Sequence, residues 1–119
     1  HHKILVVDDE RFIVKLLSDI LKPSYKVIAA IKGEQAIKAA RSDNPPSLIL
    51  LDVMMPEMDG YEVISQLKAD EQTRSIPVIF VTALDGVDDK EKGLILGAAD
   101  FIFKPVSPDA VLTTVAKHL

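Results

Sequence analysis

Short, continuous runs of apolar residues recur along the chain, and amphipathic segments separate them. The apolar runs cover residues 3–7, 26–30, 48–51, 77–81 and 100–103. Short runs of this kind are typical of parallel β-strands that are covered on both faces of a sheet. The pattern therefore predicts five strands that are largely buried.

Helical periodicity fills the segments between these runs. The first helix is predicted from an apolar stripe that Pro23 ends, and the stripe consists of Phe12, Ile13, Leu16, Leu17, Ile20 and Leu21. A second helix is predicted over residues 33–42 and a third around residues 63–67. A fourth, over residues 87–97, is mostly polar and takes Gly97 as its C-cap.

The last helix has a clear start signal. Ser107 is a favoured N-cap residue, and Pro108 suits the first turn because its φ angle is already helical. His118 is interpreted as a cation in the last turn, without a functional role. The residues of this helix that are expected to be buried are Val111, Leu112, Val115 and Leu119.

Five strands that alternate with five helices indicate βαβ units, a parallel sheet and right-handed crossovers. A barrel needs eight such units, so the predicted α/β architecture is an open sheet with helices on both faces. The sequence contains no linker or repeat, so residues 1–119 are predicted to form a single domain. Open sheets of this class bind ligands beyond the carboxyl ends of their strands.

Unusual polar residues stand at four of the predicted strand ends. Asp8 and Asp9 follow the first strand, Asp52 follows the third, Thr82 follows the fourth, and Lys104 follows the fifth. Because the carboxyl ends of parallel strands lie at one edge of the sheet, all five side chains are expected to face one crevice.

The chemistry of this set favours phosphoryl transfer. Clustered carboxylates repel one another, and a hard divalent cation such as Mg²⁺ neutralises them with oxygen ligands. Carboxylates, a metal, a lysine and a hydroxyl are the parts that phosphoryl transfer uses, and a carboxylate such as Asp52 can itself accept the phosphoryl group. The sequence lacks a GxxxxGK[ST] loop, so a P-loop nucleotide site is excluded.

Composition narrows the class of protein further. The chain has 119 residues and a formal net charge of −4, so no nucleic-acid binding surface is expected. It has no cysteine, which excludes disulfides and thiolate metal ligands. No segment has the length of a membrane span and no signal peptide fits, so a cytoplasmic location is expected. His1 and His2 could be the remnant of a purification tag.

Four stretches of the sequence carry a resemblance to a known family. VVDDE (6–10), LLDVMMPEMDG (50–60), VTAL (81–84) and FIFKPV (101–106) resemble, in order and spacing, the receiver domain of two-component response regulators. The chain resembles this family over its whole length and is similar to the chemotaxis receivers within it. It implies a flavodoxin-like, doubly wound sheet with strand order 2-1-3-4-5 in three α/β/α layers. Any output domain would lie outside this chain.

The resemblance also implies a metal site and a phosphoacceptor. Asp52 would accept the phosphoryl group. Asp9, Asp52 and the backbone carbonyl of Met54 would bind Mg²⁺ directly, and Asp8 would act through water; Mn²⁺ is an alternative ion. Without the resemblance, Asp8 and Asp9 could simply cap the following helix, since acids favour helix N-termini.

The remaining implied roles concern the response to phosphorylation. Thr82 would be the switch hydroxyl, with the small Ala83 beside it, and Lys104 would pair with Asp52 or the phosphoryl group. The bond between Lys104 and Pro105 is implied to be cis. Phe101 takes the position of the switch aromatic, although a core ring that never moves is the competing interpretation.

The implied function is a signalling switch rather than an enzyme. The phosphoryl donor would be a sensor histidine kinase or a histidine phosphotransfer protein, and a homodimer through the fourth helix, fifth strand and fifth helix is a further expectation. The alternative is a degenerate receiver-like domain that binds partners without phosphorylation. A flavodoxin-like cofactor binder is a weaker rival, because Asp8, Asp9 and Glu10 would repel a cofactor phosphate unless a metal intervened. A small-molecule phosphatase is weaker still.

Overall fold

The computed structural model describes residues 2–119, so His1, one of the two residues interpreted as a tag remnant, lies outside the described residues. Five strands alternate with five helices along this part of the chain, as the apolar pattern predicted. In chain order they are β1 (Lys3–Val7), α1 (Arg11–Leu21), β2 (Lys26–Ala30), α2 (Gly33–Ala40), β3 (Leu48–Leu51), α3 (Gly60–Ala69), β4 (Val78–Thr82), α4 (Val87–Leu96), β5 (Asp100–Phe103) and α5 (Pro108–Lys117).

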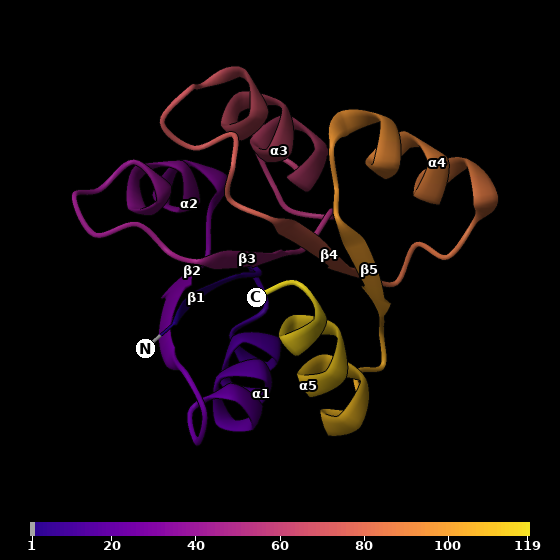
Figure 1. Cartoon of the computed structure of the whole chain (residues 1–119). Helices are drawn as coiled ribbons and strands as arrows, with labels where there is room; N and C mark the ends of the chain where they lie inside the picture. The colour runs from indigo at the N-terminus through magenta and orange to yellow at the C-terminus, as the bar shows by residue number, and fades with distance from the viewer. Residues whose placement is uncertain (1) are drawn as a thin grey trace.

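The strands form one parallel sheet with the order β2-β1-β3-β4-β5. The open, doubly wound, flavodoxin-like fold is therefore confirmed. Figure 1 shows α2, α3 and α4 over one face of the sheet and α1 and α5 over the other. Helices on both faces explain why the central strands β3 and β4 consist entirely of buried residues.

Two cores form because successive side chains of a strand point to opposite faces. In β1, Leu5 and Val7 belong to the core beneath α2 and α3. Ile4 and Val6 belong to the core beneath α1 and α5. This arrangement leaves the strand ends as the place where polar side chains can gather.

The helix ends follow local sequence signals. Asp59 caps α3 by accepting a hydrogen bond from the backbone N–H of Glu62 at 2.9 Å, and Ser107 caps α5 in the same way through Ala110 at 3.2 Å. Gly97 ends α4 in the left-handed conformation, with φ of 109°, which glycine adopts without steric cost. The predicted caps at Gly97 and Ser107 are confirmed.

The ends of the first and last helices differ from their apolar patterns, and one prediction, the burial of Leu119, is wrong. Phe12 is 74% exposed because it lies in the first turn of α1, next to the strand ends and away from the core. Leu119 is 38% exposed because α5 ends at Lys117. His118 does have a partner, since its Nε2 lies 2.9 Å from Oδ2 of Asp100 in β5.

Among residues 2–119, no helix combines the length and the apolar character needed to cross a bilayer.

Candidate functional site

The carboxylates predicted at the strand ends meet at one place. Asp8 and Asp9 follow β1, and Asp52 follows β3, which is hydrogen-bonded to β1. The backbone N–H of Asp52 donates to the carbonyl of Val7 at 2.9 Å, which fixes the two strand ends side by side. Each of the three aspartates offers a carboxylate oxygen within 4.8 Å of the other two. Oxygen donors at this spacing fit a hard divalent cation.

Both carboxylate oxygens of Asp8 accept hydrogen bonds at this place. The side chain is buried; one oxygen accepts from the backbone N–H of Glu10 at 2.9 Å, and the other accepts from Nζ of Lys104 at 2.9 Å. The N-cap of α1 is Glu10, and no side chain caps that helix. The geometry therefore gives no support to the interpretation of Asp8 and Asp9 as helix caps only.

Lys104 crosses from the end of β5 to the carboxylates. Its Nζ lies 2.9 Å from Asp8, 3.6 Å from Asp52 and 3.8 Å from Glu10. The nearest partner is thus Asp8, whereas the resemblance implied a pairing with Asp52 or a phosphoryl group. Glu10 was expected only to help repel a cofactor phosphate, and its contact with Lys104 was not predicted. Its position directly after the two aspartates was the available signal.

The surroundings of Asp52 disfavour its negative charge. Burial of this carboxyl, which is only 3% exposed, and the neighbouring charge of Asp8 raise its pKa from 3.8 to about 6. The charge of Lys104 and a hydrogen bond with the backbone of Met54 oppose this rise but do not cancel it. Asp52 is therefore an anion with an incomplete set of partners, and a cation or a proton would stabilise it.

The same surroundings that disfavour the charged form of Asp52 favour the charged form of Lys104. Burial alone would lower its pKa, but the hydrogen bond with Asp8 and the charges of Asp52, Asp8 and Glu10 together raise it. The lysine is therefore fully protonated near neutral pH and supplies a fixed positive charge.

The loop after Asp52 forms one wall of the site. The Met54 side chain is 64% exposed, while its backbone is hydrogen-bonded with the Asp52 carboxylate. Gly60 begins α3 directly against the Asp52 backbone, and a Cβ at this position would lie 2.2 Å from the Asp52 carbonyl oxygen. No side chain fits there. Nothing in the sequence showed this close approach of Gly60 to the Asp52 backbone.

The predicted switch residues lie on the neighbouring strands. Thr82 ends β4 and is fully buried; its hydroxyl accepts from the backbone N–H of Leu84 at 3.1 Å, and its carbonyl accepts from the N–H of Lys104 at 2.9 Å. Phe101 in β5 is half-buried, and its ring centroid lies 5.8 Å from that of Phe80. The peptide bond between Lys104 and Pro105 is cis.

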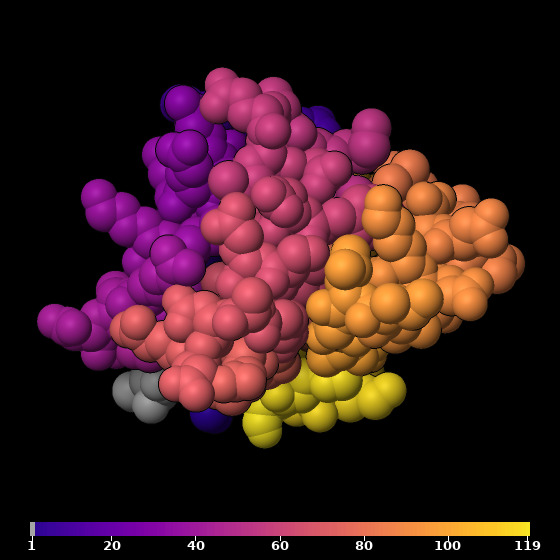
Figure 2. All heavy atoms as spheres, turned by 90° about the horizontal axis from the view of Figure 1, so that it is seen from above, coloured from indigo at the N-terminus to yellow at the C-terminus, as the bar shows by residue number. Residues whose placement is uncertain are grey.

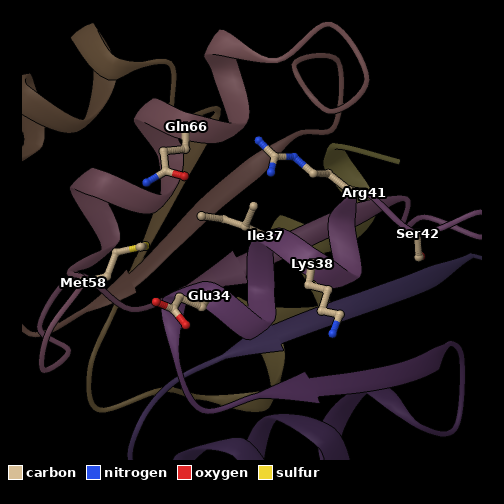
Figure 3. Close-up of a pocket in the computed structure, with 7 residues that line it drawn as sticks. All are labelled: Glu34, Ile37, Lys38, Arg41, Ser42, Met58 and Gln66. Atoms are coloured by element: carbon tan, nitrogen blue, oxygen red, sulfur yellow. The ribbon is translucent and has the colours of Figure 1, made fainter.

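A separate groove lies between α2 and α3, lined by Glu34, Ile37, Lys38, Arg41, Ser42, Met58 and Gln66 (Figure 3). None of the three clustered aspartates lines it, and Arg41 is already paired with Asp70 at 2.7 Å. The candidate functional site is therefore the cluster of carboxylates at the strand ends and not this groove.

Fold and site together define an α/β domain that presents clustered carboxylates and a lysine at the carboxyl edge of a parallel sheet. Such a site suits metal-dependent transfer of a phosphoryl group to a carboxylate. The family model described as the response regulator receiver domain matches residues 4–116. This match covers nearly all of the chain, so the chain belongs to the receiver domain family of two-component response regulators.

Individual proteins agree with this assignment. A probable cyclic di-GMP phosphodiesterase of Vibrio cholerae is 42% identical over 98% of this chain, which spans 26% of that protein. The alkaline phosphatase synthesis transcriptional regulatory protein PhoP of Bacillus subtilis is 50% identical over 92% of this chain, which spans 45% of PhoP. The chain thus spans less than half of the length of these curated relatives.

A solved structure supports the fold and the kind of site. The receiver domain of the sensor histidine kinase PA1611 from Pseudomonas aeruginosa superposes with a TM-score of 0.89 at 27% identity, covering 98% of this chain and 96% of that one. In that receiver domain a magnesium ion is coordinated in the active-site cleft.

Proposed function

We propose that Asp52 is the residue of this receiver domain that accepts the phosphoryl group. The observation that carries the proposal is the cluster of Asp8, Asp9 and Asp52 within 4.8 Å, with Lys104 bound to it. Of these carboxylates, Asp52 follows the central strand β3, and Nζ of Lys104 lies farther from it, at 3.6 Å, than from Asp8, at 2.9 Å. A carboxylate oxygen of Asp52 forms the new O–P bond while the P–N bond of a phosphohistidine breaks, and the histidine nitrogen keeps the bonding pair.

The same residues form the proposed Mg²⁺ site. Asp9, Asp52 and the carbonyl of Met54 would hold the ion directly, and Asp8 would hold it through water; an all-oxygen donor set fits Mg²⁺ and also admits Mn²⁺. When bound, the ion neutralises the negative charge that the phosphoryl group brings to the carboxylates. The magnesium-bearing receiver of the kinase PA1611 supports this proposal.

Lys104, Thr82 and Phe101 carry out the remaining steps. The ammonium of Lys104 would move from Asp8 towards the phosphoryl oxygens, since it lies within 4 Å of both aspartates. The hydroxyl of Thr82 would leave the Leu84 amide and donate to the phosphoryl group. Phe101 would follow, which shifts a two-state equilibrium at α4 and β5.

The partners are those of a signalling domain. A sensor histidine kinase or a histidine phosphotransfer protein would supply the phosphoryl group in the cytoplasm. A homodimer would form through α4, β5 and α5, where Val87, Ile95 and Phe103 are exposed.

The domain would act as a switch and not as an enzyme, without binding nucleic acid itself. We place residues 1–119 in one domain, with any output domain outside them.

The test uses acetyl phosphate as a small donor and beryllofluoride as a phosphoryl analogue, each with Mg²⁺. Mass spectrometry of the intact chain should show the addition of one phosphoryl group, which Asp52→Asn abolishes. Asp43→Asn, which changes an exposed acid in the loop after α2, is the matched control and should behave as wild type. Labelling of Asp52→Asn at the wild-type level would refute the assignment. Failure of the wild-type chain to be labelled would favour the phosphorylation-independent alternative, which the comparisons do not support.

A further inference from the structure

Helix α4 lacks the apolar row that usually seats a helix on a sheet. Its one buried residue is Gly93, while Val87, Leu94 and Ile95 are 80%, 51% and 78% exposed. Near its end, only Leu96 is partly buried against the core. In Figure 2 the orange atoms of α4 stand beside α3 on the face that α2, α3 and α4 cover. The contact between α4 and the sheet therefore centres on a residue without a side chain.

The ring of Phe101 occupies the space beside this glycine. A Cβ at position 93 would lie 2.6 Å from Cζ and 3.0 Å from Cε2 of Phe101, and 3.2 Å from Cδ2 of Phe80. Real Cβ atoms do not approach other atoms as closely as 2.6 Å. With the ring in this position, glycine is the only residue that fits at 93 while α4 stays where it is.

The ring is held by further aromatic contacts across the sheet. The centroids of Phe101 and Phe103 lie 6.1 Å apart with nearly parallel planes, and Phe80 lies 5.8 Å from Phe101 on the other side. Tyr61 of α3 meets Phe80 edge-on at 5.7 Å, and Nζ of Lys92 in α4 lies 4.3 Å above the Tyr61 ring. Helix α4 thus rests on an aromatic row that runs from α3 to β5.

We propose that Gly93 is a positioning residue that couples the Phe101 ring to the placement of α4. The ring and the helix backbone are in contact at Gly93, so a displacement of either changes the space that is open to the other. The proposal rests on the proposed function, because it gives Phe101 a role in transmitting phosphorylation. The coupling would depend on the space that the ring fills. It would therefore work with phenylalanine, which has no hydroxyl group on its ring.

A helix-interior glycine normally weakens its helix. Replacement of glycine by alanine on an exposed helix face raises the folding equilibrium constant by about fivefold. At position 93 the new methyl group meets the Phe101 ring, and overpacking of this kind lowers the folding equilibrium constant by about tenfold or more. The sign of the effect therefore reports whether the ring occupies the space.

The decisive experiment is a double-mutant cycle with Gly93→Ala and Phe101→Leu, followed by urea unfolding. Leucine remains apolar but lacks the two ring atoms that collide with the Cβ. We expect Gly93→Ala to lower the folding equilibrium constant about tenfold in the wild-type background and to leave it unchanged or raise it in the Phe101→Leu background. The same effect in both backgrounds would overturn the proposal. If Gly93→Ala alone does not fold, a folded double variant supports the proposal and an unfolded one overturns it.

A second readout separates coupling from simple packing. The apparent affinity for beryllofluoride at saturating Mg²⁺ should rise at least about threefold in Gly93→Ala, because the methyl group excludes the present ring position and the analogue favours the position to which the ring moves when Thr82 leaves Leu84. Phe101→Leu should remove this sensitivity, and Lys90→Ala on the exposed side of α4 should leave the affinity unchanged. An unchanged affinity in Gly93→Ala would refute the coupling. The Asp52→Asn variant tests the proposed function separately. If this variant still binds beryllofluoride like the wild type, the proposed function is refuted, whatever the result for Gly93→Ala.

Discussion

Replacement of the phosphoacceptor candidate by its neutral isostere should make the metal-free domain more stable. Asp52 is buried beside Asp8, and its pKa rises from 3.8 to about 6 on folding. Between these values the folded chain holds the proton more firmly than the unfolded chain does. The stability of the wild-type domain is therefore penalised as the pH rises through this window.

The size of the effect follows from the two pKa values. Integrating the linkage relation, ionisation of Asp52 costs about 1 kcal/mol at about pH 4.5 and about 3 kcal/mol at about pH 7.5. Asp52→Asn carries no charge, so the variant avoids this cost. We expect it to unfold with a free energy that exceeds the wild-type value by these amounts, with the gain growing as the pH rises.

The assay is urea unfolding followed by far-ultraviolet circular dichroism, with a chelator present and ionic strength held constant across the pH series. Asp43→Asn, an exposed acid outside the cluster, should show no comparable gain. Addition of Mg²⁺ should stabilise the wild-type chain more than Asp52→Asn, because the ion loses a ligand in the variant. If Asp52→Asn is less stable than wild type near neutral pH, or if its gain does not vary with pH, the electrostatic account of the site is wrong.

Three further perturbations test other parts of the site. Lys104→Met leaves the buried Asp8 without its cation, so we expect a loss of about 3 kcal/mol in the chelated protein, measured by urea unfolding and partly recovered with Mg²⁺. Gly60→Ala places a methyl group 2.2 Å from the Asp52 carbonyl, so we expect a loss of about 2 kcal/mol or more together with weaker Mg²⁺ binding by calorimetry. Asp59→Ala removes the cap of α3 and should cost about 1 kcal/mol while leaving Mg²⁺ affinity unchanged; a change in affinity would contradict a purely capping role.

Periodicity predicted the elements well because each strand consists mostly of a continuous apolar run. The expectation that the strands are largely buried holds for β1, β3 and β4 but not for the edge strands β2 and β5, which have a neighbouring strand on one side only. Periodicity could not predict the strand order, which followed from the family resemblance and not from the residues. It included Phe12 in the apolar stripe of the first helix, and an apolar residue in such a stripe gives no sign that its turn projects past the end of the sheet. The exposure of Phe12 depends on where β1 stops relative to α1, which is a tertiary property.

The site was predictable in its membership but not in its pairing. Parallel strands bring their carboxyl ends together, so Asp8, Asp9 and Asp52 had to be neighbours. Which of them would bind Lys104 depends on differences of less than 1 Å, since its Nζ lies 2.9 Å from Asp8 and 3.6 Å from Asp52. Sequence patterns do not resolve such differences. The close approach of Gly60 to the Asp52 backbone was equally hidden, because a glycine after an aspartate also fits an ordinary turn.

The helices are packed unequally against the sheet, which suggests where the structure would change if Asp52 were phosphorylated. Asp52 is held by the buried strand β3, and Lys104 draws the end of β5 towards the cluster. Helix α4, in contrast, contacts the sheet mainly through Gly93 and an aromatic ring. Because β3 and β4 are buried along their whole length, we expect a charge added at Asp52 to be accommodated at the end of β5 and at α4. A phosphorylated site built this way would change the α4 surface first, where the exposed Val87 and Ile95 already offer apolar contacts.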